Sequence, residues 1–142
     1  MSTPSQIKRY AVKSSFRDYH ITLEVDHSIL TPERAQMINS FWSDSDARAN
    51  AEDGDTVRAV IRFAGLTLIN IMLTQGGADF SEKTTNPVLG INAGPLWTKD
   101  LHDEEGWGGA TDGEPFGWCG IRCIAAAVET PEFDDLDLEQ LA

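Results

Sequence analysis

A period of two runs through Tyr19-His20-Ile21-Thr22-Leu23-Glu24-Val25-Asp26, where apolar residues alternate with polar ones. This alternation predicts a β-strand with one face in the core. The preceding stretch, Ile7 to Val12, repeats the pattern less regularly, and a short connection at 14–18 separates the two. We therefore expect an antiparallel hairpin at this end of the chain.

Helices are predicted to follow the hairpin. Thr31 and Pro32 are typical of a helix start, because a threonine hydroxyl caps free backbone amides and proline suits the first helical position. A short polar helix is expected within 43–53. Asp55 is a suitable cap for a third, strongly apolar helix that ends at Gly76-Gly77. Its last turns are apolar over most of their circumference, so it either crosses the middle of the domain or meets a second subunit.

The chain changes character over 78–118, which is rich in glycine and tryptophan and shows little periodicity. We expect a long irregular, acidic insert there, far longer than an ordinary loop. The apolar run from Cys119 to Glu129 then predicts a buried third strand. Together these patterns predict a single α+β domain over 1–130, with a small antiparallel sheet covered on one face by two or three helices, and an acidic tail over 131–142.

The net charge excludes several classes of partner. The chain has 11 Lys and Arg against 23 Asp and Glu, a formal charge of −12. Such a surface repels phosphate, so direct nucleic-acid binding and binding to anionic membranes are not expected. Neither a signal peptide nor a membrane-spanning run is recognisable, which indicates a cytoplasmic protein. Half of the excess negative charge lies in residues 129–142.

The residues offer little support for catalysis. Cys119 and Cys123 on one strand face would lie about 13 Å apart, at ~3.3 Å per residue, so we expect free thiols. A thiol paired with His102 is conceivable, but strand cysteines usually act as small hydrophobes. The run 102–105 offers metal ligands that cannot all turn toward one ion, and the glycines of 106–109 lie among acids that repel a nucleotide. We therefore predict no cofactor and no metal site.

The acidic, tryptophan-rich segment is the candidate binding surface. Tryptophan is enriched at binding hot spots, and acidic neighbours steer a basic partner toward them. The alternative is that these aromatics fold back and cover the sheet. The candidate contact residues are Trp97, Asp100, Asp103, Glu104, Glu105, Trp107, Asp112, Glu114 and Trp118.

Several motifs, which lie mainly within residues 8–72, resemble an uncharacterised bacterial family, domain of unknown function 2528. They are Lys8-Arg9-Tyr10, the run from Asp18 to His27, Leu30-Thr31-Pro32-Glu33, Ile38-Asn39-Ser40-Phe41-Trp42, Gly54-Asp55-Thr56-Val57-Arg58-Ala59-Val60, Asp112-Gly113 and Gly120-Ile121-Arg122. The resemblance implies no activity or catalytic residues. It implies a context, since such proteins occur in bacteria and often on phages, prophages and plasmids, and the segment from Trp97 to Trp118 departs from it.

Three functions fit these observations. The leading hypothesis is a non-enzymatic accessory or counter-defence protein of a mobile element, which occupies a basic, nucleic-acid-binding surface of a host protein complex. The second is a small hydrolytic or metal-assisted enzyme that uses the acidic, tryptophan-rich loop. The third is a homo-oligomeric structural protein, with a homodimer as the simplest case, that buries the last turns of the third helix between subunits.

Overall fold

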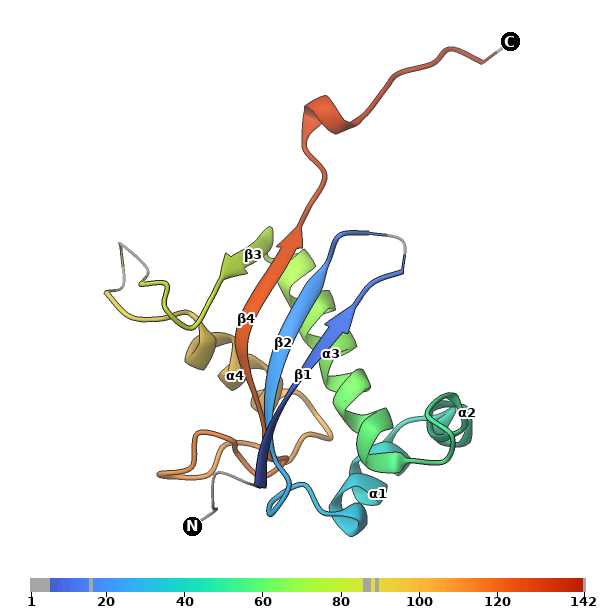
Figure 1. Ribbon diagram of the computed structural model, residues 1–142. Coiled ribbons are helices and arrows are strands. Elements are labelled where there is room, and N and C mark those ends of the chain that lie inside the picture. Colours follow the sequence, from blue (N-terminus) through green and yellow to red (C-terminus); the bar gives the residue numbers. More distant parts are fainter. Residues whose placement is uncertain (1–5, 16, 86–87, 89, 142) are drawn as a thin grey trace.

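The computed structural model describes residues 6–15, 17–85, 88 and 90–141. Figure 1 shows a sheet in front of the longest helix and a tail that extends away from the body. In chain order the elements are β1 (Ile7–Lys13), β2 (His20–Asp26), α1 (Pro32–Phe41), α2 (Ser45–Ala51), α3 (Thr56–Thr74), β3 (Gly77–Phe80), α4 (Gly94–Asp103) and β4 (Ile121–Glu129), followed by a 3₁₀ turn, Phe133–Asp135, in the tail.

The strands form one antiparallel sheet in the order β1-β2-β4-β3. β1 and β2 pair from Ile7 opposite Asp26 to Lys13 opposite His20, which confirms the predicted hairpin. β4 lies between β2 and β3, so the strand that is last in the sequence is central in the sheet. The fold is therefore the expected α+β domain, with β3 as an additional edge strand.

β4 begins at Ile121, two residues later than predicted. The chain turns at Gly120, where φ is +79° and a Cβ would lie 2.9 Å from the backbone nitrogen of Leu30. Only glycine fits this position without strain. Cys119 consequently lies in the turn and Cys123 in the strand, and both are buried free thiols, as predicted.

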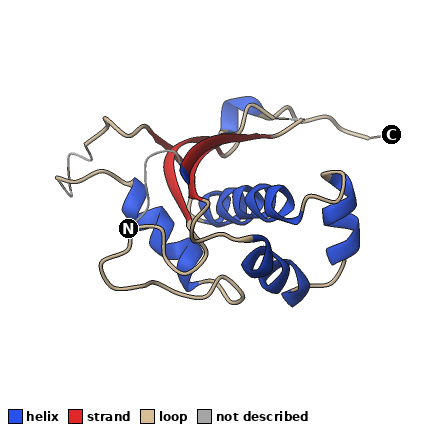
Figure 2. Cartoon of the chain, turned by 60° about the horizontal axis from the view of Figure 1, so that its bottom comes forward, coloured by secondary structure: helices blue, strands red, loops and turns tan. Residues whose placement is uncertain are grey.

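The α-helices lie under one face of the sheet, as Figure 2 shows. α3 crosses the middle of this layer, which is one of the two arrangements expected for it. Its fully buried Val60, Ala64, Leu68 and Met72 join the inward side chains of the sheet in one core. Burial of each larger aliphatic side chain contributes roughly 1.5–3 kcal/mol. By length and composition alone α3 could also cross a membrane, and it is the one such helix in the described residues.

The predicted helix starts are confirmed by their caps. Thr31 Oγ1 accepts a hydrogen bond from the backbone N–H of Arg34 at 3.3 Å, and Pro32 occupies the first turn of α1. Asp55 Oδ1 accepts from the backbone N–H of Arg58 at 3.1 Å and so caps α3. Each cap satisfies a donor that the helix itself leaves free.

The segment 78–118 is not irregular throughout, because it contains most of β3 and all of α4. α4 was missed since its buried face is partly polar. Thr98 Oγ1 accepts from the backbone N–H of Cys123 at 2.9 Å, and His102 Nε2 lies 2.8 Å from the carbonyl oxygen of Ile121. These hydrogen bonds allow polar residues to face β4. The buried face of α4 therefore lacks the regular apolar repeat by which a helix is predicted from sequence.

Trp107 is the largest fully buried side chain of the described core. Its ring centroid lies 5.6 Å from that of Trp42 and 5.9 Å from that of Phe63. The neighbouring Gly108 lets the chain pack against a further tryptophan, because a Cβ there would lie 2.1 Å from the ring of Trp118. The irregular segment therefore folds back and adds aromatic area to the core, as the alternative interpretation of its tryptophans predicts.

Gly65→Ala is expected to destabilise the fold, although alanine favours helices. A Cβ at this position of α3 would lie 2.6–2.7 Å from three side-chain atoms of Val12 on β1, and overpacking of this kind costs about 1–3 kcal/mol. In a Val12→Ala background the same substitution should cost clearly less. Urea denaturation of the single and double variants measures this coupling, and equal costs in both backgrounds would show that the contact does not set the helix-to-sheet distance.

The thiols are expected to be unreactive in the folded protein. Burial raises the pKa of Cys119 and Cys123 from 9.0 to about 12, so almost no thiolate is present at pH 8. A chromogenic disulfide should label them only after unfolding in urea. Because the unfolded chain loses these protons first, the thiols also reduce stability as the pH rises from about 9 toward 12. Full labelling of the native protein within seconds would contradict the burial.

Candidate functional site

The residues predicted to contact a partner lie in several different parts of the fold. α4 carries Trp97 and Asp100, both half-buried, and ends at the exposed Asp103. Lys99 on the same helix forms an ion pair with Asp103. The turn that follows places Glu104 and Glu105 on the surface. Asp103, Glu104 and Glu105 thus lie together at the end of α4.

The other predicted residues lie elsewhere. Asp112 and Glu114 belong to a tight turn that is closed by a bridge between Thr111 and Glu114. Trp118 is half-buried, and the guanidinium carbon of Arg34 lies 4.7 Å from its ring centroid. Trp107 is fully buried. Its proposed role in direct partner contact is therefore corrected, since its indole completes the aromatic core instead.

Three of the nine predicted residues line one hollow on a flank of α3. Glu104 and Glu105 reach it from the turn after α4, and Trp107 reaches it from the core. The hollow has a volume of about 470 Å³, and we call it the acidic hollow. Its lining residues are Trp42, Phe63, Thr67, Asn70, Ile71, Thr74, Glu104, Glu105 and Trp107.

The acidic hollow combines carboxylates with aromatic rings and has no cation in its lining. Within the described chain, neither Glu104 nor Glu105 forms an ion pair. The rings of Trp42 and Phe63 meet edge to face, with centroids 4.7 Å apart. Carboxylates and aromatic faces both attract a cationic side chain, so the hollow has the chemistry to receive lysine or arginine.

The residues considered for catalysis face inward. His102 is 4% exposed, and its Nε2 lies 2.8 Å from the carbonyl oxygen of Ile121. The thiol of Cys119 lies 3.9 Å from the same oxygen. Both side chains therefore turn to one backbone acceptor, and the raised pKa keeps the thiol protonated. Among the described residues, no three His, Cys, Asp or Glu side chains are grouped as metal ligands.

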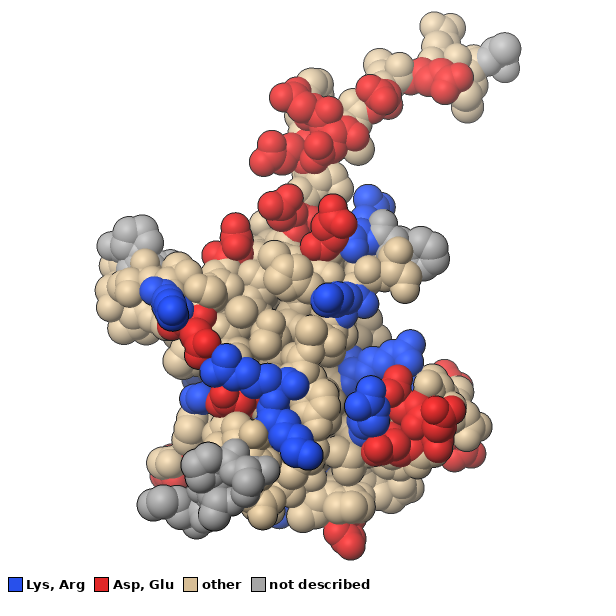
Figure 3. Space-filling model, viewed as in Figure 1, with Lys and Arg blue, Asp and Glu red and all other residues tan. Residues whose placement is uncertain are grey.

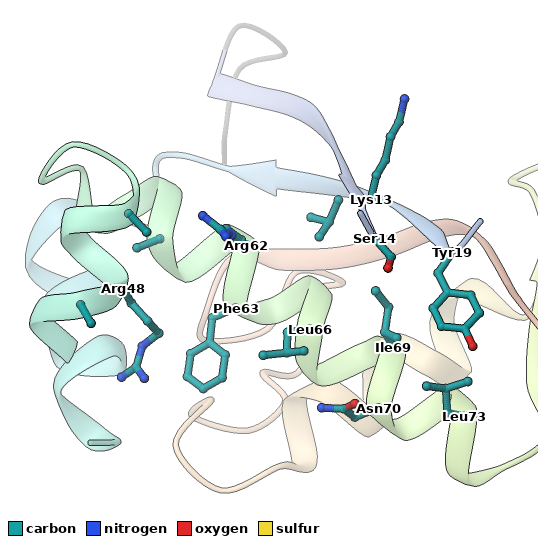
Figure 4. A pocket seen from close by; sticks show the side chains of 14 residues that line it. Lys13, Ser14, Tyr19, Arg48, Arg62, Phe63, Leu66, Ile69, Asn70 and Leu73 are labelled. Carbon is teal, nitrogen blue, oxygen red and sulfur yellow. The ribbon is translucent and has the colours of Figure 1, made fainter. Parts of the chain in front are cut away.

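A second cavity lies between α3, β1 and α2, and we call it the α3 groove. Figure 4 shows Leu66, Ile69 and Leu73 of α3 on one side of it and Lys13 on the other. Its volume is about 600 Å³. It could not be found by sequence reasoning, because its residues come from separate segments. They are Val12, Lys13, Ser14, Tyr19, Ala47, Arg48, Ala51, Ala59, Arg62, Phe63, Leu66, Ile69, Asn70 and Leu73.

The charges are unevenly distributed over the surface. Figure 3 shows Lys and Arg side chains gathered over the open face of the sheet and acidic side chains along the tail. On the sheet, Arg9 donates to Glu24 at 3.2 Å and to Glu82 at 2.9 Å, and Arg122 donates to Glu24 at 2.9 Å. Although the net charge of the chain is −12, its surface thus includes one face where Lys and Arg side chains gather.

Comparisons with known proteins find relatives in phage lambda and in a lambda prophage. It is 31% identical over 103 residues to protein ea10 of Escherichia phage lambda, which covers 72% of this chain and 75% of that protein. The lambda prophage-derived protein ea10 of Escherichia coli O6:H1 strain CFT073 is similar to the same extent. No solved structure matches the chain. The model of the family DUF2528, described as a protein of unknown function, matches residues 20–138, and the chain therefore belongs to this family.

Proposed function

We propose that the chain is a non-enzymatic accessory protein of a phage or related mobile element, which binds a basic surface of a host protein in the cytoplasm. One observation carries the proposal: Glu104 and Glu105 have no ion-pair partner within the described chain and line an aromatic hollow whose lining contains no Lys or Arg. A lysine or arginine of a partner would supply the missing positive charge. The phage proteins to which the chain is similar support the mobile-element context.

The acidic hollow fits a cationic side chain better than it fits other ligands. A guanidinium at its rim could donate to a carboxylate, and such charge-assisted hydrogen bonds contribute about 1.5–3 kcal/mol. The same cation could also lie against Trp42, and a cation–π contact adds roughly 0.5–2 kcal/mol; the Phe63 ring already has Arg48 over it. The remaining negative charge of the protein would accelerate encounter with a basic surface.

Basic surfaces that bind nucleic acid are the natural class of target for such a site. They present clustered Lys and Arg to phosphates, and an acidic protein can occupy the same cations. We therefore propose that binding blocks a nucleic-acid site on a host regulatory or defence complex, in the manner of an inhibitor. The buried, protonated thiols are consistent with a role that requires no nucleophile.

Glu104→Gln/Glu105→Gln is expected to weaken binding of an arginine-rich peptide at least tenfold, because it removes both carboxylates from the hollow. Titration followed by tryptophan fluorescence measures the change, since Trp42 lines the site. Asp18→Asn/Asp46→Asn is the matched control, as it removes the same charge from exposed residues outside the hollow. The control should bind almost as wild type, and all three proteins should have similar melting temperatures.

The same variants identify the natural partner. Host proteins that are captured by wild type and by the control, but lost with Glu104→Gln/Glu105→Gln, are the expected targets. They should carry a basic surface, and the wild-type chain should release them from immobilised DNA or RNA. If both double variants bind the peptide and capture proteins equally, the acidic hollow is not the binding site.

A further inference from the structure

The tail exposes apolar side chains that nothing in the described body covers. Phe133 is 90% exposed, Leu136 is 67% exposed and Leu138 is completely exposed. Figure 1 shows the tail extending away from the end of β4. Exposed apolar side chains at this density are typical of a segment that binds another surface.

Acidic residues accompany these apolar side chains. Residues 129–141 contain Glu129, Glu132, Asp134, Asp135, Asp137 and Glu139 and no lysine or arginine. The backbone is extended at Leu136, with φ −113° and ψ 138°. In an extended segment that begins at Leu136, Leu136 and Leu138 share one side while Asp137 and Glu139 take the other. The tail is therefore apolar on one side and anionic on the other.

The α3 groove has the complementary character. Its apolar floor includes Leu66, which is 51% exposed, and Ile69 and Leu73 of the same helix. The charged residues of its lining are Lys13, Arg48 and Arg62, and no acidic residue contributes to it. An apolar cavity with a cationic rim is unexpected in a chain with a net charge of −12.

Two of these cations form no ion pair within the described chain. Arg48 donates to four neutral oxygens of Asn39, Ser43 and Trp42, and its guanidinium carbon lies 4.6 Å from the centroid of the Phe63 ring. Lys13 forms no ion pair with any described residue. Arg62 is different, because it donates to Glu52 at 3.1 Å. The rim can therefore attract carboxylates from another segment.

We propose that residues 133–141 of one copy bind in the α3 groove of a second copy, so that two chains exchange tails. Leu136 and Leu138 would enter the groove, and the tail carboxylates would face Lys13 and Arg48. A reciprocal exchange uses each contact twice about a twofold axis and leaves no surface unmatched. The dimer would bury the apolar flank of α3, which is the helix whose sequence suggests a subunit contact.

The position of the tail favours a second copy over the chain's own groove. The tail leaves the end of β4 beside β3, where Glu129 pairs with Gly77. The groove lies along β1, on the far side of β2 in the strand order. Because the tail also extends away from the body in Figure 1, it is presented to a neighbour.

Sedimentation of the full chain over a range of concentrations tests this proposal. Wild type is expected to dimerise, and raised salt should weaken the dimer. Leu136→Ser/Leu138→Ser in the tail and Leu66→Glu in the groove should each weaken self-association at least tenfold. All three positions are exposed, so the folded monomer should be retained, which circular dichroism can check. Leu96→Glu, on the exposed part of α4, is the matched control and should dimerise as wild type.

Mixing the variants separates exchange between copies from other modes of association. The tail variant retains an intact groove and the groove variant retains an intact tail, so an equimolar mixture should regain association through one contact. Glu104→Gln/Glu105→Gln should leave dimerisation unchanged, which keeps this test independent of the proposed partner site. A wild-type chain that stays monomeric throughout, or a dimer that survives in both variants, would overturn the proposal.

Discussion

The close contact between α3 and β1 sets the geometry of the whole domain. Gly65 allows the helix to approach Val12 to a distance at which even a methyl group would collide. At this distance the buried stripe of α3, with Leu68 at its centre, packs under the sheet in one core. Close packing of this kind makes the position of α3 sensitive to a single carbon atom.

The two candidate binding sites depend on this placement, because each lies on a flank of α3. The acidic hollow is closed by the turn after α4, and the α3 groove is closed by β1 and α2. Phe63 and Asn70 line both cavities. The helix is thus the common wall between an anionic site and a cationic one, and a shift of α3 would alter both.

The net charge of −12 is the sum of anionic and cationic regions that lie at different places on the surface. Among the described residues, the carboxylates of the tail and of the acidic hollow form no ion pair, whereas Lys13 and Arg48 line the apolar groove. A chain of this kind can attract a basic partner at one surface and a second copy of itself at another. In both proposals, electrostatics selects the partner and apolar or aromatic contacts hold it.

The sequence by itself determined the elements whose signals are local. The alternation from Tyr19 to Asp26 specifies the hairpin strand, and Thr31 and Asp55 specify where two helices begin, since periodicity and capping act within a few residues. α4 escaped prediction because hydrogen bonds to β4, distant in sequence, allow Thr98 and His102 to be buried. Tertiary structure alone decided that Trp107 is core and that Glu104 and Trp42 line one hollow, because side-chain burial and cavity shape arise only when separate segments pack together.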